Sequence, residues 1–202
     1  NTPLYVPKLA LLDPRLTMSC PRSVIVSSGM DALTHAMESY VAKNANPISR
    51  IFSKEAFSLV FNSLPKVVDE PDNIELWARM QLGAYYAGIA LMNSGAGPAG
   101  AMSYPLGVYF QVPHGLAGGV FLVPVGRLNV KRGCPLYADL YDLIQDADRG
   151  MSPKQKNIVF FDRLSHLCEK LGVPGSLKAF DVSRRDVPIL AEETMQLKGA
   201  VE

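Results

Sequence analysis

Cysteine, histidine and tryptophan are scarce in this chain, whose 202 residues include three, three and one of them. Cys20, Cys134 and Cys168 lie far apart and form no CxxC or CxxH pair. This pattern indicates neither a disulfide framework nor a cysteine zinc site. Free thiols fit a reducing compartment, so we expect a cytoplasmic protein.

An excess of charge of one sign is also absent. Lys and Arg total 20 against 19 Asp and Glu. This balance gives no electrostatic reason to propose a nucleic acid or an anionic membrane as partner, and it favours small molecules. No apolar run approaches the ~18 to 20 residues that span a bilayer, and the start lacks a signal-peptide pattern. Because the sequence begins with Asn1 and not Met, we expect the natural N-terminus to lie elsewhere.

The first 22 residues differ from the rest of the chain. They are rich in proline and contain the short apolar run Leu9-Ala10-Leu11-Leu12, which ends in an Asp13-Pro14 turn and predicts a β-strand. A single strand cannot form a sheet, so we expect its partners in a domain outside this sequence. We therefore divide the chain into a crossing strand and linker over 1–22 and a helical domain over 23–202.

Helical periodicity dominates from Gly29 onward, and the predicted fold class is an all-α helical bundle. The apolar spacing is clearest over 30–42. A second helix is predicted over 49–68, with Pro65 as a candidate point of interruption, and a third from Asp72 or Asn73 towards Gly95. The remaining predicted helices cover 99–106, 116–130, 135–146, 154–171 and 184–198.

Two short segments carry the candidate chemistry. Asp31 and His35 stand one helical turn apart, so their side chains can share one ion. A carboxylate with an imidazole suits Fe(II) or Zn(II) better than Ca(II). The alternative is a purely structural role, in which an Asp at the start of a helix forms a hydrogen bond with a partly buried His. This alternative is favoured when the pair is considered without the rest of the sequence. The second segment is Val112-Pro113-His114-Gly115, where small residues follow a histidine.

The blocks GMDALTHAMESYVAKNANPIS and YPLGVYFQVPHGLAGG resemble the iron-containing, group III alcohol dehydrogenases. In that family the first block runs G-x-D-A-L-x-H-A-x-E, and the second H-x3-H-P-L-G-x6-P-H-G. The resemblance runs from Leu9 to at least Asn129 and becomes diffuse beyond Pro135. Such enzymes pair an N-terminal nucleotide-binding domain with a C-terminal helical domain, and this chain resembles the latter. No Gly-rich pyrophosphate loop is present, so no cofactor-binding residue is assigned.

The resemblance implies a dehydrogenase that transfers hydride between an alcohol and NAD or NADP, with a divalent metal polarising the substrate oxygen, and it implies a homodimer. It transfers the metal-ligand role to Asp31, His35 and His114. The fourth ligand histidine of the family falls on Gly100, and the histidine near the nicotinamide falls on Tyr104. A glycine offers no side-chain donor, so the implied metal site is incomplete.

Three interpretations of the incomplete site stay open. The ion persists on Asp31, His35, His114 and water, as in open catalytic zinc sites. Tyr104 swings its phenol towards the gap, as an oxygen ligand or a proton donor. Alternatively no metal binds, as in the related maleylacetate reductases, and Tyr104 with His114 polarises the carbonyl as the catalytic hydrogen-bond donors. A non-catalytic helical domain with a decayed site is a further alternative.

Two other residues with ionisable side chains are assigned lesser roles. Glu38 follows His35 on the same predicted helix, where it can orient a neighbour, although an exposed or capping role is favoured. His166 lies far downstream on an amphipathic segment and is interpreted as a surface or packing residue.

Overall fold

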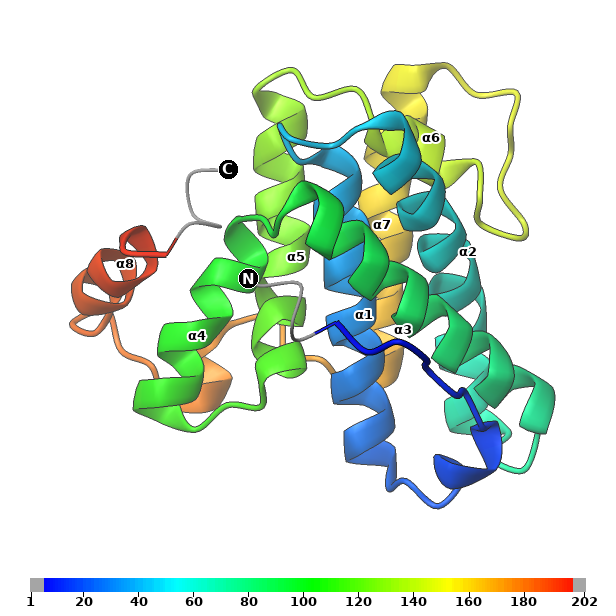
Figure 1. Ribbon diagram of the computed structural model, residues 1–202. Helices are drawn as coiled ribbons and strands as arrows, with labels where there is room; N and C mark the ends of the chain where they lie inside the picture. Colours follow the sequence, from blue (N-terminus) through cyan, green and yellow to red (C-terminus); the bar gives the residue numbers. More distant parts are fainter. Residues whose placement is uncertain (1–5, 198–202) are drawn as a thin grey trace.

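The computed structural model describes residues 6–197, and every regular element in that range is helical (Figure 1). The predicted all-α class is confirmed. The elements are η2 (Pro14–Leu16), α1 (Arg22–Val41), α2 (Pro47–Asp69), α3 (Ile74–Ser94), α4 (Pro98–Phe110), α5 (His114–Lys131), α6 (Tyr137–Tyr141), α7 (Pro153–Leu171), η3 (Leu177–Phe180) and α8 (Val187–Met195).

Local capping chemistry fixes the ends of several helices. Asn46 and Ser49 exchange side-chain and backbone hydrogen bonds as a capping box at the start of α2. Ser152 and Gln155 do the same for α7. Helix α7 ends at Gly172, whose φ of 77° is the left-handed conformation that glycine adopts without a steric penalty. These sequence signals explain why both helices begin and end close to their predicted bounds.

Three predictions about the elements are wrong in detail. Helix α1 begins at Arg22 and not near residue 30, because Ile25 and Val26 already pack into the core. Helix α2 continues through Pro65, since the flanking buried side chains offset the lost backbone hydrogen bond. The helix expected over 135–146 shrinks to α6, with turns on either side.

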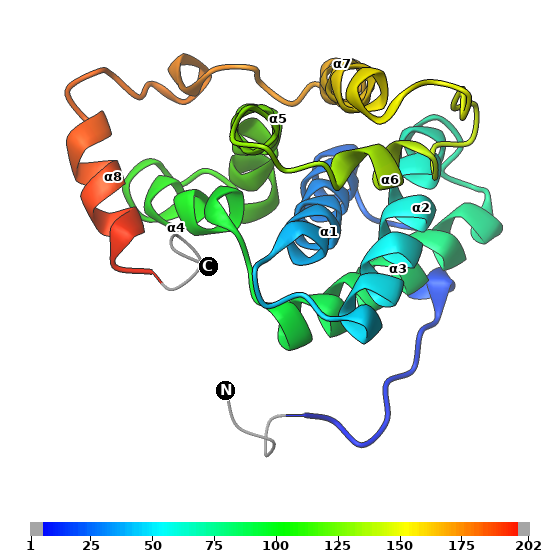
Figure 2. The same ribbon diagram turned by 90° about the horizontal axis from the view of Figure 1, so that it is seen from above.

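The strand predicted at Leu9–Leu12 is not formed. No residue from 6 to 197 is in a strand, and Leu9 and Leu11 are 73% and 85% exposed. A strand needs the backbone groups of a neighbour to complete its ladder, and the described part of the chain provides none. The segment runs along the outside of the bundle as an extended tail (Figure 2).

Helix α1 occupies the centre of the bundle. It packs against α2 and α3 on one side and against α5 and α4 on the other (Figures 1 and 2). Its buried face includes Met30, Leu33, Ala36 and Met37, all at most 1% exposed. Because α1 is buried between two groups of helices, residues on its remaining face are held rigidly relative to α4 and α5.

The described residues contain two hydrophobic clusters. The larger joins buried residues of α1, α2, α3, α6 and α7 with Ala99 of α4 and with Val120 and Leu122 of α5. A smaller one, of Leu106, Val112, Ala117, Val182 and Leu190, lies between α4, α5 and α8. Cys20, Cys134 and Cys168 are free thiols, as expected. Over residues 6–197 no helix has both the length and the apolar character required to cross a bilayer.

An aromatic group in the larger cluster gives the first prediction. Phe160 is fully buried, and its ring lies 5.0 to 5.8 Å from those of Phe57, Tyr137 and Phe161. Phe160→Ala should lower the free energy of unfolding by about 3–5 kcal/mol, because it removes buried contacts and leaves a cavity. Ile158→Ala, at a 57% exposed position of α7, should cost less than about 1 kcal/mol. Urea denaturation measures both, and equal losses would contradict this packing.

Candidate metal centre

Asp31 and His35 lie on α1, on the part of the helix that faces α5. Their side chains are 34% and 22% exposed, and Nε2 of His35 is 3.7 Å from Oδ1 of Asp31. Burial lowers the pKa of His35, an effect that the nearby Asp31 carboxylate opposes and His114 reinforces. His35 is therefore a neutral imidazole at pH 7, the form that offers a lone pair to a metal.

His114 completes a group of three donors. It is the first residue of α5, and its Nε2 lies 3.6 Å from the same Asp31 Oδ1. One donor atom from each of Asp31, His35 and His114 falls within 4.8 Å of the others. Separations of 3.6–3.7 Å are too long for hydrogen bonds. They are close to the roughly 3.4 Å between two ligands of one tetrahedral ion with bonds of about 2.1 Å.

The three predicted metal ligands thus converge, and this convergence depends on Gly115. A Cβ atom at this position would overlap the backbone oxygen of Ser27 and the Cβ of Asp31. Only glycine lets the first turn of α5 approach the backbone of α1 so closely. The residue after His114 therefore determines how close its imidazole comes to Asp31.

Ser103 is a site residue that sequence reasoning missed. Its Oγ lies 2.5 Å from the carbonyl oxygen of Gly100 and 2.8 Å from Nδ1 of His114. The same Oγ lies 3.4 Å from Nε2 of His114, so it contacts both ring nitrogens at the face of the imidazole. No sequence signal marks Ser103, which is one small residue among several in α4.

The order Ser103, His114, Asp31 also resembles the triad of a hydrolase, but burial excludes that role. Ser103 is 0% exposed, and its hydroxyl hydrogen is engaged by the Gly100 carbonyl. A nucleophile must reach the substrate and have its proton taken by the base. Ser103 therefore acts as a buried contact of the His114 ring that restricts its orientation.

Glu38 is buried, so the expectation of an exposed position is wrong. The expected capping role is confirmed, but the helix that Glu38 caps is not its own. The residue is 4% exposed, and its carboxylate accepts hydrogen bonds from the backbone N–H groups of Gly97, Ala99 and Gly100. It caps α4 although it belongs to α1. Burial raises the pKa of the Glu38 carboxyl, and the three amide bonds partly offset that effect.

Tyr104 and His166 occupy very different surroundings. The Tyr104 ring lies against the His114 imidazole, with centroids 4.7 Å apart, and the residue is 57% exposed. Tyr104 thus lies beside the three donors on the solvent side. His166 is exposed on α7 and lines a surface hollow with Asn62 and Lys170, so its interpretation as a surface residue is confirmed.

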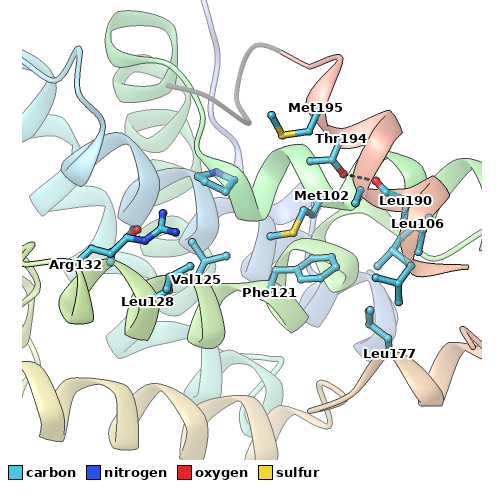
Figure 3. Close-up of a pocket in the computed structure, with 14 residues that line it drawn as sticks. Met102, Leu106, Phe121, Val125, Leu128, Arg132, Leu177, Leu190, Thr194 and Met195 are labelled. Atoms are coloured by element: carbon cyan, nitrogen blue, oxygen red, sulfur yellow. Dashed lines mark hydrogen bonds between the residues drawn. The ribbon is translucent and has the colours of Figure 1, made fainter. Parts of the chain in front are cut away.

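Helix α4 also borders an apolar cavity of about 400 Å³, which it shares with α5 and α8 (Figure 3). Met102 and Leu106 line it from α4, Phe121 from α5 and Leu190 from α8. Among the described residues that line it, Arg132 is the one with an ionisable side chain. None of the three donors lines this cavity, so the candidate metal centre lies outside it.

A sequence model of the C-terminal part of the Fe-containing alcohol dehydrogenase family matches residues 25–201. The match extends beyond Pro135, the point after which the resemblance of the motif blocks becomes diffuse. The 1,3-propanediol dehydrogenase of Klebsiella pneumoniae is 30% identical over 95% of this chain and 49% of its own length. The NAD-dependent methanol dehydrogenase of Bacillus methanolicus is 30% identical over 94% of this chain and 50% of its own. The chain spans about half the length of these curated relatives.

Solved structures agree with the sequence matches. A 1,3-propanediol oxidoreductase superposes with a TM-score of 0.89 and 30% identity, over 93% of this chain and 49% of that one. The iron-containing alcohol dehydrogenase of Thermococcus thioreducens gives a TM-score of 0.83 and 31% identity, over 96% and 49%. The all-helical arrangement is therefore the one found in half of each of those chains.

The contact at Gly115 gives the second prediction. Gly115→Ala should push α5 away from α1 and separate His114 from Asp31, so we expect at least tenfold weaker Zn(II) binding with a lowered melting temperature. Gly88→Ala is the matched control, because no atom lies within 4 Å of its added Cβ and alanine favours the helix interior. Calorimetric titration and thermal unfolding measure the two effects. Unchanged Zn(II) affinity in Gly115→Ala would contradict the proposed role of this contact.

Proposed function

The chain belongs to the iron-containing alcohol dehydrogenase family, and we propose that it supplies the metal and substrate side of an NAD(P)-dependent dehydrogenase. The proposed reaction moves hydride between a small alcohol and its aldehyde or ketone. The observation that carries this proposal is the convergence of Asp31, His35 and His114 on one point. Relatives of known activity support it, among them dehydrogenases for 1,3-propanediol and methanol.

The donor set fits a first-row divalent ion. Two imidazole nitrogens and one carboxylate oxygen suit Fe(II) or Zn(II), and the observed separations suit a single ion. Gly100 adds no donor, so three protein ligands leave a position open for water or substrate. When bound there, such an ion lowers the pKa of an alcohol and stabilises negative charge on its oxygen.

The residues of this chain prepare that site before any ligand arrives. Burial lowers the pKa of His35 and so favours its neutral form, and Ser103 contacts both nitrogens of the His114 ring, so both imidazoles are held in place beside Asp31. Such preorganisation means that little rearrangement is needed when the ion binds. We assign NAD or NADP binding to residues outside this chain.

The position of Tyr104 beside His114 supports a second candidate function, that of a metal-independent carbonyl reductase. Its ring packs on His114 at the exposed side of the site, and Gly100 offers no fourth ligand. In that mechanism the Tyr104 phenol and the His114 imidazole act as neutral donors to a substrate carbonyl oxygen. The two candidates share the same residues and differ in which group polarises the substrate.

Chelation combined with Tyr104→Phe distinguishes the two candidates. The full-length protein, which includes the residues that bind NAD(P), is purified and assayed with short-chain alcohols and aldehydes and with NAD(P)⁺ or NAD(P)H, before and after chelator treatment. We expect activity to vanish on chelation and to return with Fe(II) or Zn(II), and Tyr104→Phe to lose less than about tenfold in kcat. Chelator-resistant activity with a loss on the order of 10²-fold or more in Tyr104→Phe would favour the metal-independent reductase. No activity under any of these conditions would overturn both.

A further inference from the structure

The cavity between α4, α5 and α8 is separate from the three metal donors and has the features of a binding site of its own. Its volume of about 400 Å³ lies in the range of natural small-molecule pockets. Helix α5 contributes Phe121, Val125, Leu128 and Arg132, which follow one another at intervals of three or four residues on one face. At a rise of ~1.5 Å per residue, this row extends over about 16 Å. The cavity is therefore elongated along α5.

The two ends of the cavity differ in their chemistry. Leu106, Leu177 and Leu190 lie at one end, and Arg132 lies at the other (Figure 3). No aspartate or glutamate is found among the described residues that line it. A molecule that fills the cavity must therefore be apolar over most of its length, and it can place a negative charge at the Arg132 end without meeting a like charge in the lining.

Arg132 is the polar lining group that remains available to a ligand. The side-chain amide of Asn129 already donates to the hydroxyl of Tyr137, and the hydroxyl of Thr194 donates to the carbonyl of Leu190. By contrast, none of the ion pairs formed within residues 6–197 includes Arg132. A guanidinium presents a planar fork of N–H donors that matches the two oxygens of a carboxylate.

We propose that this cavity binds a linear carboxylate amphiphile, the anion of an unbranched fatty acid, with its carboxylate on Arg132 and its alkyl chain directed towards Leu106 and Leu190. An extended chain advances about 1.2 Å per bond, so a length of about 16 Å accommodates roughly ten to twelve carbons. The proposal does not rest on the proposed function, because none of the metal donors lines the cavity.

The dependence of affinity on chain length is the first measurement. The full-length protein is treated with a chelator, so that no carboxylate can bind a metal ion, and is titrated calorimetrically with hexanoate, octanoate and decanoate. Each extension by two carbons should tighten binding about tenfold, because two further CH₂ groups leave water. Decanoate should also slow the amide hydrogen exchange of α8, since this helix forms one side of the cavity.

The role of Arg132 is tested by Arg132→Gln. This change should weaken decanoate binding about tenfold, because it removes a hydrogen bond between charged groups, and it should alter the affinity for the uncharged methyl decanoate by less than twofold. Arg127→Gln is the matched control on the same helix. Arg127 pairs with Asp162 and does not line the cavity, so both affinities should stay unaltered.

A substitution that fills the cavity tests where the chain lies. Val125 lines the cavity between its two ends, so Val125→Phe should weaken the binding of decanoate and of methyl decanoate by more than tenfold. Thermal unfolding shows whether this variant is folded. If it is not, Ala191→Phe replaces it, because Ala191 lines the cavity from an exposed position of α8.

Three results would overturn the proposal: no binding of decanoate, affinity that does not change with chain length, or unchanged decanoate affinity in Arg132→Gln. A segment outside residues 6–197 that occupies the cavity in the full-length protein would prevent binding and lead to the first of these results. A protein that binds decanoate in this way but has no dehydrogenase activity would contradict the proposed function and leave the amphiphile site supported.

Discussion

The close contact between α1 and α5 at Gly115 is the constraint on which the candidate metal centre depends. Asp31 and His35 are fixed by the burial of α1 between two groups of helices. His114 reaches them only because the next residue has no side chain to hold the two backbones apart. The chemistry of the site therefore follows from the packing of the bundle: the same central helix that fills the core also carries two of the three donors.

Helix α4 carries both Ser103, which contacts His114, and Gly100, which stands where the family pattern has a ligand histidine. Gly100 brings no imidazole, yet its peptide joins the buried Glu38 to Ser103 and so to His114. Polar groups buried in this way are costly unless each is paired, and here the described bonds satisfy the carboxylate with three amides. Helix α4 therefore contributes backbone and hydroxyl contacts, and no metal donor, to the candidate site.

The sequence was sufficient to predict the helical class, because helical spacing is a local signal. The family resemblance of the two motif blocks singled out Asp31, His35 and His114, whose donor atoms do lie close together, and their metal-ligand role stays a prediction. The sequence was not sufficient for Ser103 or for the burial of Glu38. The contacts of Ser103 and the burial of Glu38 depend on which helices pack together. Neither a serine among small residues nor a glutamate after a histidine indicates, from the neighbouring sequence, which residue it will contact. The early start of α1 and the continuity of α2 across Pro65 were missed for the same reason, since tertiary burial outweighed local breakers. The prediction of a strand at Leu9–Leu12 is wrong, because a strand needs a second strand to pair with and the described residues include none.

The most direct test of the three-donor centre is X-ray absorption spectroscopy at the metal edge of the purified protein after loading with Fe(II) or Zn(II). We expect one ion per chain, with scattering from two imidazole rings and with oxygen atoms as the remaining neighbours. A coordination shell with three imidazoles, or the absence of a bound ion at stoichiometric supply, would contradict the centre formed by Asp31, His35 and His114.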